Sequence, residues 1–501
     1  MKSGKFFLKA VFVLFITASV IGLSSCTWFK EFVPEFDEEN LAAQAVVTVS
    51  GGNFSEGNDW LRKNNSYLTI NSLASAVLEI EFDFGTETEL NTVVLKEKGT
   101  AAGVFVIYAY SALGVWEKVY QADGIGAYRI CYLEAAATDK IKIEISEISG
   151  KTKIETVEIF DVEEKQSAFR VFQDIKFEGN NILAIKNDPL KAASFVSGLK
   201  NVTDIVVTNA YGYFHTQVPP GQRNRNPVAE EKYYGVRGTG ELSRFENNFN
   251  ALKSLIDGTQ INIWCRPDID QGDYYGAINA VSTAEFIYRT KDDVITKFSV
   301  FLTKYGFYGA DFYWDYPSHL YHWRAYNQLV TDTAEYTKVS VTSSLNEFRL
   351  DSKAKAVTES FRLLTHDTAI NGYAEMFAAV QKAIRSLGLP KEKIVLSLPL
   401  YGIDDGGAHY DYASMVTGNN TDGYVGSLGK WANTALITAG EASVSVNFSG
   451  FALTRDYTLL SIECGLFGVS LSDVAFDAPY EYEYSLRKAV SEVVSGRIKN
   501  T

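Results

Sequence analysis

The chain has 501 residues, too many for one ordinary domain, although a barrel can take up about 250 of them. Its formal net charge of −14 excludes nucleic acid as an expected partner, because a surface that binds nucleic acid is basic. Hydrophobic residues make up 46% of the chain, enough for buried cores. The aromatic share of 13% consists mostly of Tyr and Phe, which suit both core packing and the stacking of sugar rings.

The first 25 residues are typical of an export signal. Three lysines within the first nine residues precede an apolar run over residues 10–23, which is too short to span a bilayer comfortably. The run ends in LSSC, which resembles the bacterial lipobox, where cleavage precedes the cysteine and the thiol is lipidated. The sequence therefore predicts an exported lipoprotein, anchored at Cys26 to a bacterial membrane in the cell envelope or at the surface. An ordinary signal peptide with a chance cysteine is the alternative.

Residues 26–44 are acidic and are predicted to be a tether between the lipid and the first domain. The remaining cysteines, Cys131, Cys265 and Cys464, match no zinc-binding spacing and are too few for a disulfide framework. We expect small buried residues at these three positions, with a bridge between 265 and 464 as the alternative. No metal and no cofactor is expected.

Residues 45–163 are rich in strand patterns. Runs such as LEIEFDF and KIKIEI alternate apolar and polar residues and predict an antiparallel β-sandwich. The order of the runs resembles the discoidin domain, or coagulation factor 5/8 type C domain, with Asp83-Phe84-Gly85 and residues 111–116 in its motif positions. The resemblance implies a galactose-binding-like jelly roll whose end loops bind glycans, here through Trp60 in the loop 51–62. The alternative places Trp60 in the packed floor of the domain.

Residues 165–495 alternate apolar strand patterns with helical patterns, which is typical of a (β/α)8 TIM barrel. The chain is therefore predicted to be multidomain, a β-sandwich followed by a TIM barrel. The eight strand candidates are ILAIKN, VTDIVVTNAYGYF, INIWCRP, FYGADFYWDYP, TKVSVTSSL, FRLLTHD, KIVLSLPLYG and GLFGVSLSD. Barrel enzymes place their chemistry at the carboxyl ends of these strands.

The stretch YGADFYWDYP, residues 308–317, carries two acids in one strand pattern. Because alternate side chains share a face of a strand, Asp311, Tyr313 and Asp315 should point to one face and Phe312 and Trp314 to the other. Acids that face a barrel interior are costly unless they have a function or strong partners. The aromatic face should pack under the surrounding helices.

This stretch resembles the signature strand DGxDxDWEYP of glycoside hydrolase family 18, the chitinases and endo-β-N-acetylglucosaminidases. Later segments agree: LTHD stands where the family has MxYD, KIVLSLPLYG resembles its seventh strand, and GLFGVSLSD stands at its eighth. The resemblance implies a protein that acts on or binds glycans containing N-acetylglucosamine, such as chitin oligomers or N-glycan cores.

The departures from the family pattern fall on its catalytic positions. The glutamate that serves as general acid is replaced by Asp315, and the aspartate that orients the substrate is replaced by Tyr313. The tyrosine of MxYD is His366, whereas Asp367 remains, and the tryptophan of the eighth strand is replaced by Ser472. A carboxyl group misplaced by about 1 Å can reduce a rate by ~10²-fold, and a neutral tyrosine cannot stabilise the oxazolinium ion of the family mechanism.

Three functions remain open. The first is a glycosidase that uses Asp315 as its general acid, paired with Asp311 or Asp367. The second, which the substitutions favour, is a lectin that keeps the groove and has lost hydrolysis. The third is a surface adhesin in which the sandwich carries the function. The oligomeric state is not predicted. The residues expected to contact the glycan are Tyr313, Tyr316, His366, Tyr401 and Trp60.

Overall fold

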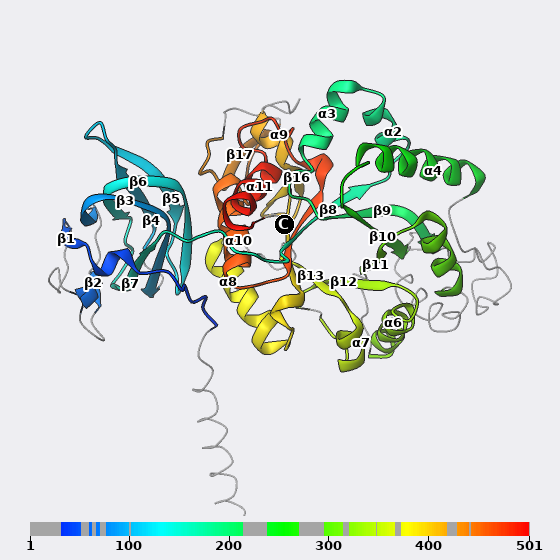
Figure 1. The fold of residues 1–501 in the computed structure, drawn as a ribbon, viewed down its shortest axis with the longest axis horizontal. Coiled ribbons are helices and arrows are strands. Elements are labelled where there is room, and N and C mark those ends of the chain that lie inside the picture. The colour runs from blue at the N-terminus through cyan, green and yellow to red at the C-terminus, as the bar shows by residue number, and fades with distance from the viewer. Residues whose placement is uncertain are drawn as a thin grey trace, which may run out of the picture. The chain divides into compact units, whose positions relative to one another are not determined.

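A computed structural model describes residues 32–51, 60–62, 67–70, 77–99, 102–213, 238–269, 295–313, 320–346, 348–365, 372–417, 428–439 and 442–499. Residues 36–501 form one compact unit that holds an antiparallel sheet and a parallel barrel (Figure 1). None of the described helices is long and apolar enough to cross a membrane.

The N-terminal part of this unit is a seven-stranded antiparallel sheet. Its strand order is β2-β7-β3-β6-β4-β5, and β1 pairs with β3. The long strand β3 bends at Gly85, which has φ +74°, and the carboxylate of Asp83 accepts a hydrogen bond from the Gly85 N–H at 2.9 Å. Two short helices, η2 (Leu41–Ala43) and η3 (Trp60–Arg62), accompany the sheet. The strands are β1 (Val46–Ser50), β2 (Leu68–Ile70), β3 (Leu78–Lys98), β4 (Val104–Tyr110), β5 (Trp116–Asp123), β6 (Arg129–Ser146) and β7 (Thr152–Phe160).

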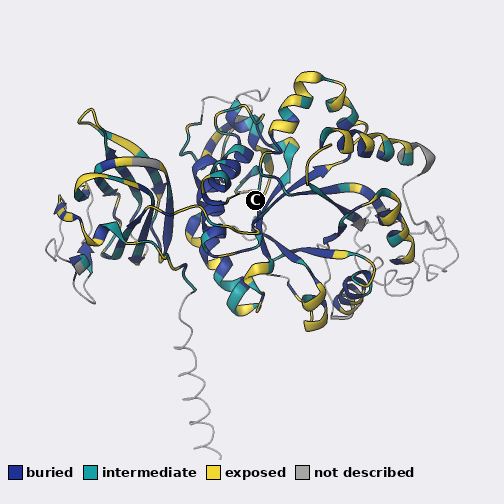
Figure 2. Ribbon diagram, viewed as in Figure 1, coloured by how far each residue is buried: buried dark blue, intermediate teal, exposed yellow. Residues whose placement is uncertain are grey.

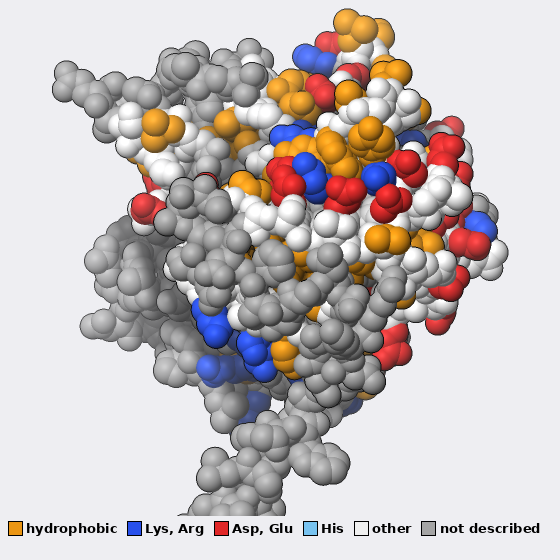
Figure 3. Space-filling view, turned by 90° about the vertical axis from the view of Figure 1, so that its left-hand side faces the viewer, with side chains coloured by type: hydrophobic (Ala, Val, Ile, Leu, Met, Phe, Trp, Pro, Cys, Tyr) orange, Lys and Arg blue, Asp and Glu red, His pale blue; other side chains and the backbone are white. Residues whose placement is uncertain are grey.

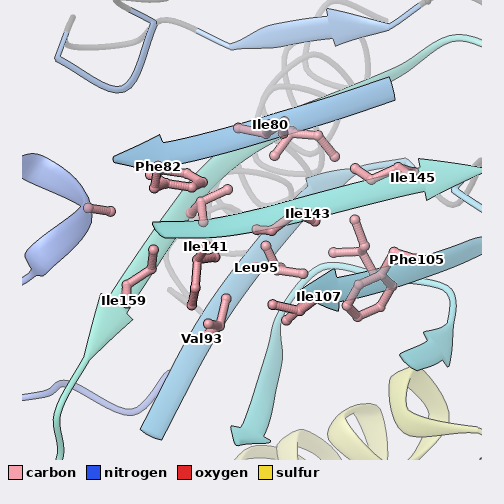
Figure 4. Close-up of a cluster of buried hydrophobic side chains, with 14 of the residues drawn as sticks. Ile80, Phe82, Val93, Leu95, Phe105, Ile107, Ile141, Ile143, Ile145 and Ile159 are labelled. Atoms are coloured by element: carbon pink, nitrogen blue, oxygen red, sulfur yellow. The ribbon is translucent and has the colours of Figure 1, made fainter. Parts of the chain in front are cut away.

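The core of the sheet follows from strict alternation. Strand β4 buries every second side chain, so Phe105 and Ile107 face inward. They meet Ile80 and Phe82 of β3 and the isoleucines of β6 in one hydrophobic cluster (Figure 4). The predicted antiparallel arrangement is confirmed, whereas the jelly roll itself stays a prediction.

The polar side of the sheet is lined by ion pairs between β3 and β6. The ammonium of Lys140 lies 2.8 Å from a carboxylate oxygen of Asp83, and that of Lys142 lies 3.6 Å from a carboxylate oxygen of Glu79. On the face drawn in Figure 3, acidic and basic side chains are interspersed with hydrophobic ones. Such exposed pairs contribute little to stability, although they keep the charge balanced locally.

Eight parallel strands close into a barrel, as predicted. They are connected in chain order, and the last strand pairs with the first, so the barrel has no edge. The buried strands lie inside a layer of helices whose outer faces are exposed (Figure 2). The strands are β8 (Arg170–Lys176), β9 (Asp204–Tyr213), β10 (Asn262–Ile269), β11 (Gly309–Tyr313), β12 (Lys338–Ser344), β13 (Ser360–Leu364), β14 (Ile394–Leu398) and β19 (Gly468–Asp473).

The helices follow the barrel strands. Gly388, with φ +61°, follows the helical segment that runs to Ser386, as is common after a helix end. The helices are α2 (Asn181–Lys186), α3 (Pro189–Ser197), α4 (Gly238–Leu255), a helix over 295–305, α6 (Leu320–Thr333), α7 (Ser352–Val357), α8 (Tyr373–Gln381), η5 (Lys382–Ser386), η6 (Lys391–Lys393), α10 (Phe451–Glu463), η7 (Val474–Phe476) and α11 (Leu486–Arg497).

The first strand candidate, ILAIKN, was wrong. These residues lie in α2, and the first barrel strand is β8, which precedes it. The side-chain oxygen of Asn248 in α4 accepts hydrogen bonds from the N–H groups of Ile182 and Leu183 at 3.1 and 3.3 Å. A tertiary contact thus satisfies N–H groups at the start of α2 that have no partner within the helix. This contact favours the helix for a short apolar run that could equally form a strand.

A small four-stranded antiparallel sheet is inserted between β14 and β19. Its strand order is β16-β15-β18-β17. Only Pro399 and Leu400 separate the end of β14 from this insert, so its first strand begins at the carboxyl end of the barrel. The elements are β15 (Tyr401–Asp404), β16 (His409–Asp411), α9 (Tyr412–Thr417), β17 (Thr434–Ala439) and β18 (Ala442–Asn447).

Helix α10 packs both against β6 of the sheet and against β14 and β19 of the barrel, and it is buried on all sides. Its Asp456 forms an ion pair of 2.8 Å with Arg129 of β6, and both side chains are buried. The hydroxyl of Tyr120 donates a 2.6 Å hydrogen bond to the same carboxylate. The guanidinium carbon of Arg129 lies 4.7 Å from the ring centroid of Tyr373. The sheet and the barrel therefore share one buried polar network.

Candidate functional site

Asp311 lies in the middle of β11 and points into the barrel. Its neighbour Phe312 points outward, where its ring packs 6.2 Å from Phe298 and 6.5 Å from Tyr326, between centroids. The predicted alternation is confirmed for these two residues, including the packing of Phe312 under the helices, whereas Trp314 lies outside the described residues.

Three neighbouring strands supply the partners of Asp311, which is fully buried. One carboxylate oxygen accepts hydrogen bonds from Arg266 Nε at 2.7 Å and from Arg362 Nη1 at 3.2 Å. The hydroxyl of Thr342 lies 3.1 Å from both carboxylate oxygens. The buried acid is therefore satisfied by two guanidinium groups and one hydroxyl.

The same two arginines also pair with a second aspartate. Arg266 Nη1 lies 3.0 Å from a carboxylate oxygen of Asp174, and Arg362 Nη2 contacts Asp174 and the hydroxyl of Ser470. Asp174, Arg266, Asp311 and Arg362 come from β8, β10, β11 and β13, and we call them the four-charge cluster. The cluster ties together strands from opposite parts of the barrel wall.

The electrostatics of the cluster keep Asp311 ionised. Burial alone would raise the pKa of the Asp311 carboxyl, but the charges of Arg266 and Arg362 outweigh burial and lower this pKa below its ordinary value of 3.8. The two aspartates in turn raise the pKa of Arg266 despite its burial. Asp311 is therefore a carboxylate at any physiological pH, and it neither carries nor releases a proton there.

The aromatic residues of β11 lie at different depths. Tyr313, at the carboxyl end of the strand, is half-buried, and the guanidinium carbon of Arg266 lies 5.6 Å from its ring centroid. Tyr308, at the amino end, packs beside Trp264 with 5.0 Å between centroids and donates to Glu359. Tyr308 thus belongs to the floor of the barrel, away from the carboxyl ends of the strands.

At the carboxyl mouth, Tyr401 follows β14 and Phe476 follows β19. The ring of Tyr401 stacks on His409 with 4.4 Å between centroids and an angle of 14°, and Phe476 stands at 6.5 Å from Tyr401. The hydroxyl of Ser472 accepts a 2.9 Å hydrogen bond from the Leu400 N–H, so this residue links β19 to the start of the insert. The structure therefore brings Tyr401 to the barrel mouth, where the sequence predicted a glycan contact.

Asp473, the last residue of β19, also lies at this mouth. Burial raises the pKa of its carboxyl, and Asp174, its register partner on β8, raises it further. Its carboxylate accepts a 3.1 Å hydrogen bond from the Ala475 N–H.

Some predicted residues lie outside the described part of the chain, and one is a correction. The residues outside it are Cys26, Asp315, Tyr316, His366 and Asp367. Trp60 is 1% exposed and belongs to the hydrophobic core of the sheet, so it has no free ring face for a sugar. The side chain in η3 points inward, which agrees with the alternative prediction that Trp60 packs in the floor of the domain. Cys131, Cys265 and Cys464 are free and buried, as predicted.

The arginines of the four-charge cluster were missed by the sequence reasoning. Each is a single charge in an apolar strand pattern, as in IWCRP and FRLL, and Asp174 stands likewise in VFQDI. A charge inside an apolar strand is a usable signal of an inward-facing ion pair. The identity of its partner is not encoded locally, since Asp174 and Arg362 are 188 residues apart.

No protein-family model and no curated protein matches the chain. Among solved structures, a glycoside hydrolase family 18 chitinase from the chitin utilization locus of Flavobacterium johnsoniae is 12% identical, over 66% of this chain and 94% of that one, with a TM-score of 0.45. A chitinase-like agglutinin from Robinia pseudoacacia is 12% identical over 64% and 98%, with a TM-score of 0.43. A glycoside hydrolase family 29 fucosidase from Ruminococcus gnavus is 22% identical, but the match covers only 25% of this chain and 27% of that one, with a TM-score of 0.23.

The chitinase and the chitinase-like agglutinin match over most of their own length, at low sequence identity. Because the TM-scores are below 0.5, the assignment of the barrel rests on its own closed ring of eight parallel strands. Among the described residues, no group of three or more His, Cys, Asp or Glu could hold a metal ion. The described part of the site offers aromatic rings and polar groups at the mouth above a neutralised interior.

Proposed function

We propose that this protein binds glycans that contain N-acetylglucosamine, such as chitin oligomers or N-glycan cores, at the carboxyl mouth of its barrel. We propose further that it does not cleave them by the mechanism of glycoside hydrolase family 18, which its sequence resembles. The observation that carries the proposal is the ion pairing of Asp311 with Arg266 and Arg362.

The reason lies in how a carboxyl group becomes a proton donor at neutral pH. A neighbouring carboxylate raises the pKa of an acid because two like charges repel each other. In this chain two guanidinium groups pair with Asp311, and their charges offset the effect of its carboxylate on the pKa of a carboxyl at position 315. The proposal therefore takes an acid at position 315 to lack the neighbouring carboxylate that would hold a proton on it at neutral pH.

The residue at position 313 supports the same conclusion. A neutral tyrosine replaces the aspartate of the family pattern, and the guanidinium of Arg266 lies near its ring. Arg266 is itself paired with Asp174 and Asp311, so this place offers no unpaired negative charge to a cationic oxazolinium ion, and the electrostatic stabilisation that the family mechanism needs is missing. Sugar binding needs neither charge.

Residues outside the barrel complete the proposal. We propose that residues 1–25 are removed, that a lipid at Cys26 anchors the protein to a bacterial membrane in the cell envelope, and that residues 26–44 are the tether. Residues 45–163 would be a discoidin-like jelly roll, which the antiparallel strand order supports. The burial of Trp60 weighs against the adhesin function in which this residue binds the glycan.

A direct test uses soluble protein from residue 27 to residue 501, with chitin oligomers and released N-glycans as ligands. Calorimetry should detect binding, and mass spectrometry should detect no cleavage products from either the wild type or Asp315→Asn. Products that the wild type forms and Asp315→Asn does not would refute the loss of the family mechanism. Absence of binding to all of these glycans, with a folded protein, would refute the proposed ligand.

One observation favours a second function, hydrolysis with a different acid. Burial and Asp174 raise the pKa of Asp473 at the carboxyl end of β19, where barrel enzymes hold catalytic groups. In that case cleavage products would persist in Asp315→Asn and disappear in Asp473→Asn. The same mass-spectrometric assay therefore separates the two functions.

A further inference from the structure

The hairpin of β15 and β16 carries a stacked pair of rings at the barrel mouth. The rings of Tyr401 and His409 are nearly parallel, at 14°, with centroids 4.4 Å apart. Tyr401 is half-buried and His409 is exposed. The stack therefore presents the imidazole of His409 outward on a tyrosine support, which fixes the orientation of the exposed ring.

Pairing between the two strands places a carboxylate on the same face of the hairpin. Tyr401 is the register partner of Asp411, and Ile403 is the register partner of His409. Residues directly opposite each other in an antiparallel pair point to the same side, so Tyr401, His409 and Asp411 share one face. The side chain of Asp411, like that of His409, is exposed.

The other face of the hairpin is already occupied. The hydroxyl of Tyr410 donates a 3.1 Å hydrogen bond to Asp404. The carboxylate of Asp404 also accepts a hydrogen bond from the Ala408 N–H at 2.8 Å, which closes the turn. This face stabilises the hairpin itself and offers a matched set of control positions.

The face with the stacked rings is continuous with the barrel mouth. Tyr401 is separated from the end of β14 by two residues, and its ring approaches Phe476, which follows β19. A saccharide that emerges from the barrel mouth between these strands would meet the hairpin next.

We propose that Tyr401, His409 and Asp411 form an accessory saccharide subsite, the hairpin subsite, which binds one pyranose ring of a longer glycan. The apolar C–H face of the sugar would stack on His409, and a hydroxyl or amide N–H of the same sugar would donate to the Asp411 carboxylate. The subsite rests on the proposed function, because it extends a glycan already bound at the mouth. It selects for glycan length.

The test titrates chitin oligomers of two to six sugars into the soluble protein by calorimetry. His409→Ala and Asp411→Asn should each weaken binding of the longest oligomers by about tenfold, and they should leave the shortest unchanged. Tyr410→Phe, on the opposite face, is the matched control and should bind every oligomer like the wild type. Circular dichroism checks that each variant is folded, and the exposure of His409 makes its truncation mild.

The outcomes separate this subsite from the proposed function. If the wild type binds but His409→Ala and Asp411→Asn bind every oligomer equally well, the hairpin subsite is refuted and the proposed function stands. A loss of the same size at every length also refutes the subsite, because it places the two residues in the primary groove. If the wild type binds no oligomer of any length, the proposed function fails first.

Discussion

Removing the guanidinium of Arg362 tests how much the four-charge cluster stabilises the barrel. The side chain of Arg362 is 1% exposed, and it lies 3.2 Å from Asp311 and also contacts Asp174. Arg362→Met keeps most of the side-chain volume but leaves both aspartates to share Arg266. Breaking a buried ion pair by removing one partner costs about 3–5 kcal/mol. Because Arg266 still contacts both aspartates, we expect the lower end, about 3 kcal/mol.

Urea unfolding, followed by far-UV circular dichroism and tryptophan fluorescence, measures this cost as a lower midpoint with an unchanged slope. Lys191→Met is the matched control, because its ion pair with Asp188, at 3.4 Å, is exposed. An exposed pair of this kind contributes less than about 1 kcal/mol. An Arg362→Met protein that unfolds at the same or a higher urea concentration than the wild type would refute the reasoning. It would mean that desolvation of the four charges outweighs their attraction.

Four other changes give expected outcomes. Because the pKa of Asp311 is lowered in the folded state, its carboxylate stabilises the fold above about pH 4, and this stability is lost as the pH falls further. In Asp311→Asn the urea midpoint should therefore decrease less than in the wild type when the pH is lowered. An equal decrease in both proteins would contradict this. Arg129→Met should lower the stability of sheet and barrel together by about 3 kcal/mol, whereas two separate transitions would argue against a shared network. Tyr313→Asp combined with Asp315→Glu should still yield no products from chitin oligomers, and mass spectrometry would expose any that form. Cys26→Ala should abolish labelling by palmitate and release the protein from membranes, and retained label would rule out the anchor.

The barrel could be predicted because most of its strands after β8 are recognisable as local apolar runs. Segments such as TKVSVTSSL and KIVLSLPLYG are apolar runs bounded by helical patterns, and their order alone implies a parallel barrel. The segment ILAIKN could not be assigned in this way, because four apolar residues in six suit a strand or a buried helix. Its helical form depends on Asn248, which is 66 residues away in the sequence.

Only part of the candidate site could be predicted from the pattern of the sequence. The inward orientation of Asp311 follows from alternation and is confirmed, whereas the glycan contact of Tyr401 stays a prediction. The partners of Asp311 were not predictable, because they come from three other strands that meet only when the barrel closes. The predicted glycan contact of Trp60 was wrong because the exposure of a side chain in a loop cannot be predicted from the residue type.

The four-charge cluster also constrains how this chain can change over generations. Replacing any single member leaves a buried charge with too few partners, at a cost of about 3–5 kcal/mol, which is a large part of the 5–15 kcal/mol that separates folded from unfolded proteins. A return to an acid-rich barrel would have to remove an arginine and rearrange an aspartate together, on β8, β10, β11 and β13. Each single replacement on that path is expected to lower the free energy of unfolding. The loss of stability makes it difficult for the ion-paired interior to return to an acid-rich one. Single substitutions at the rim of the barrel cost little stability, so the rim is the part of the molecule that can diverge.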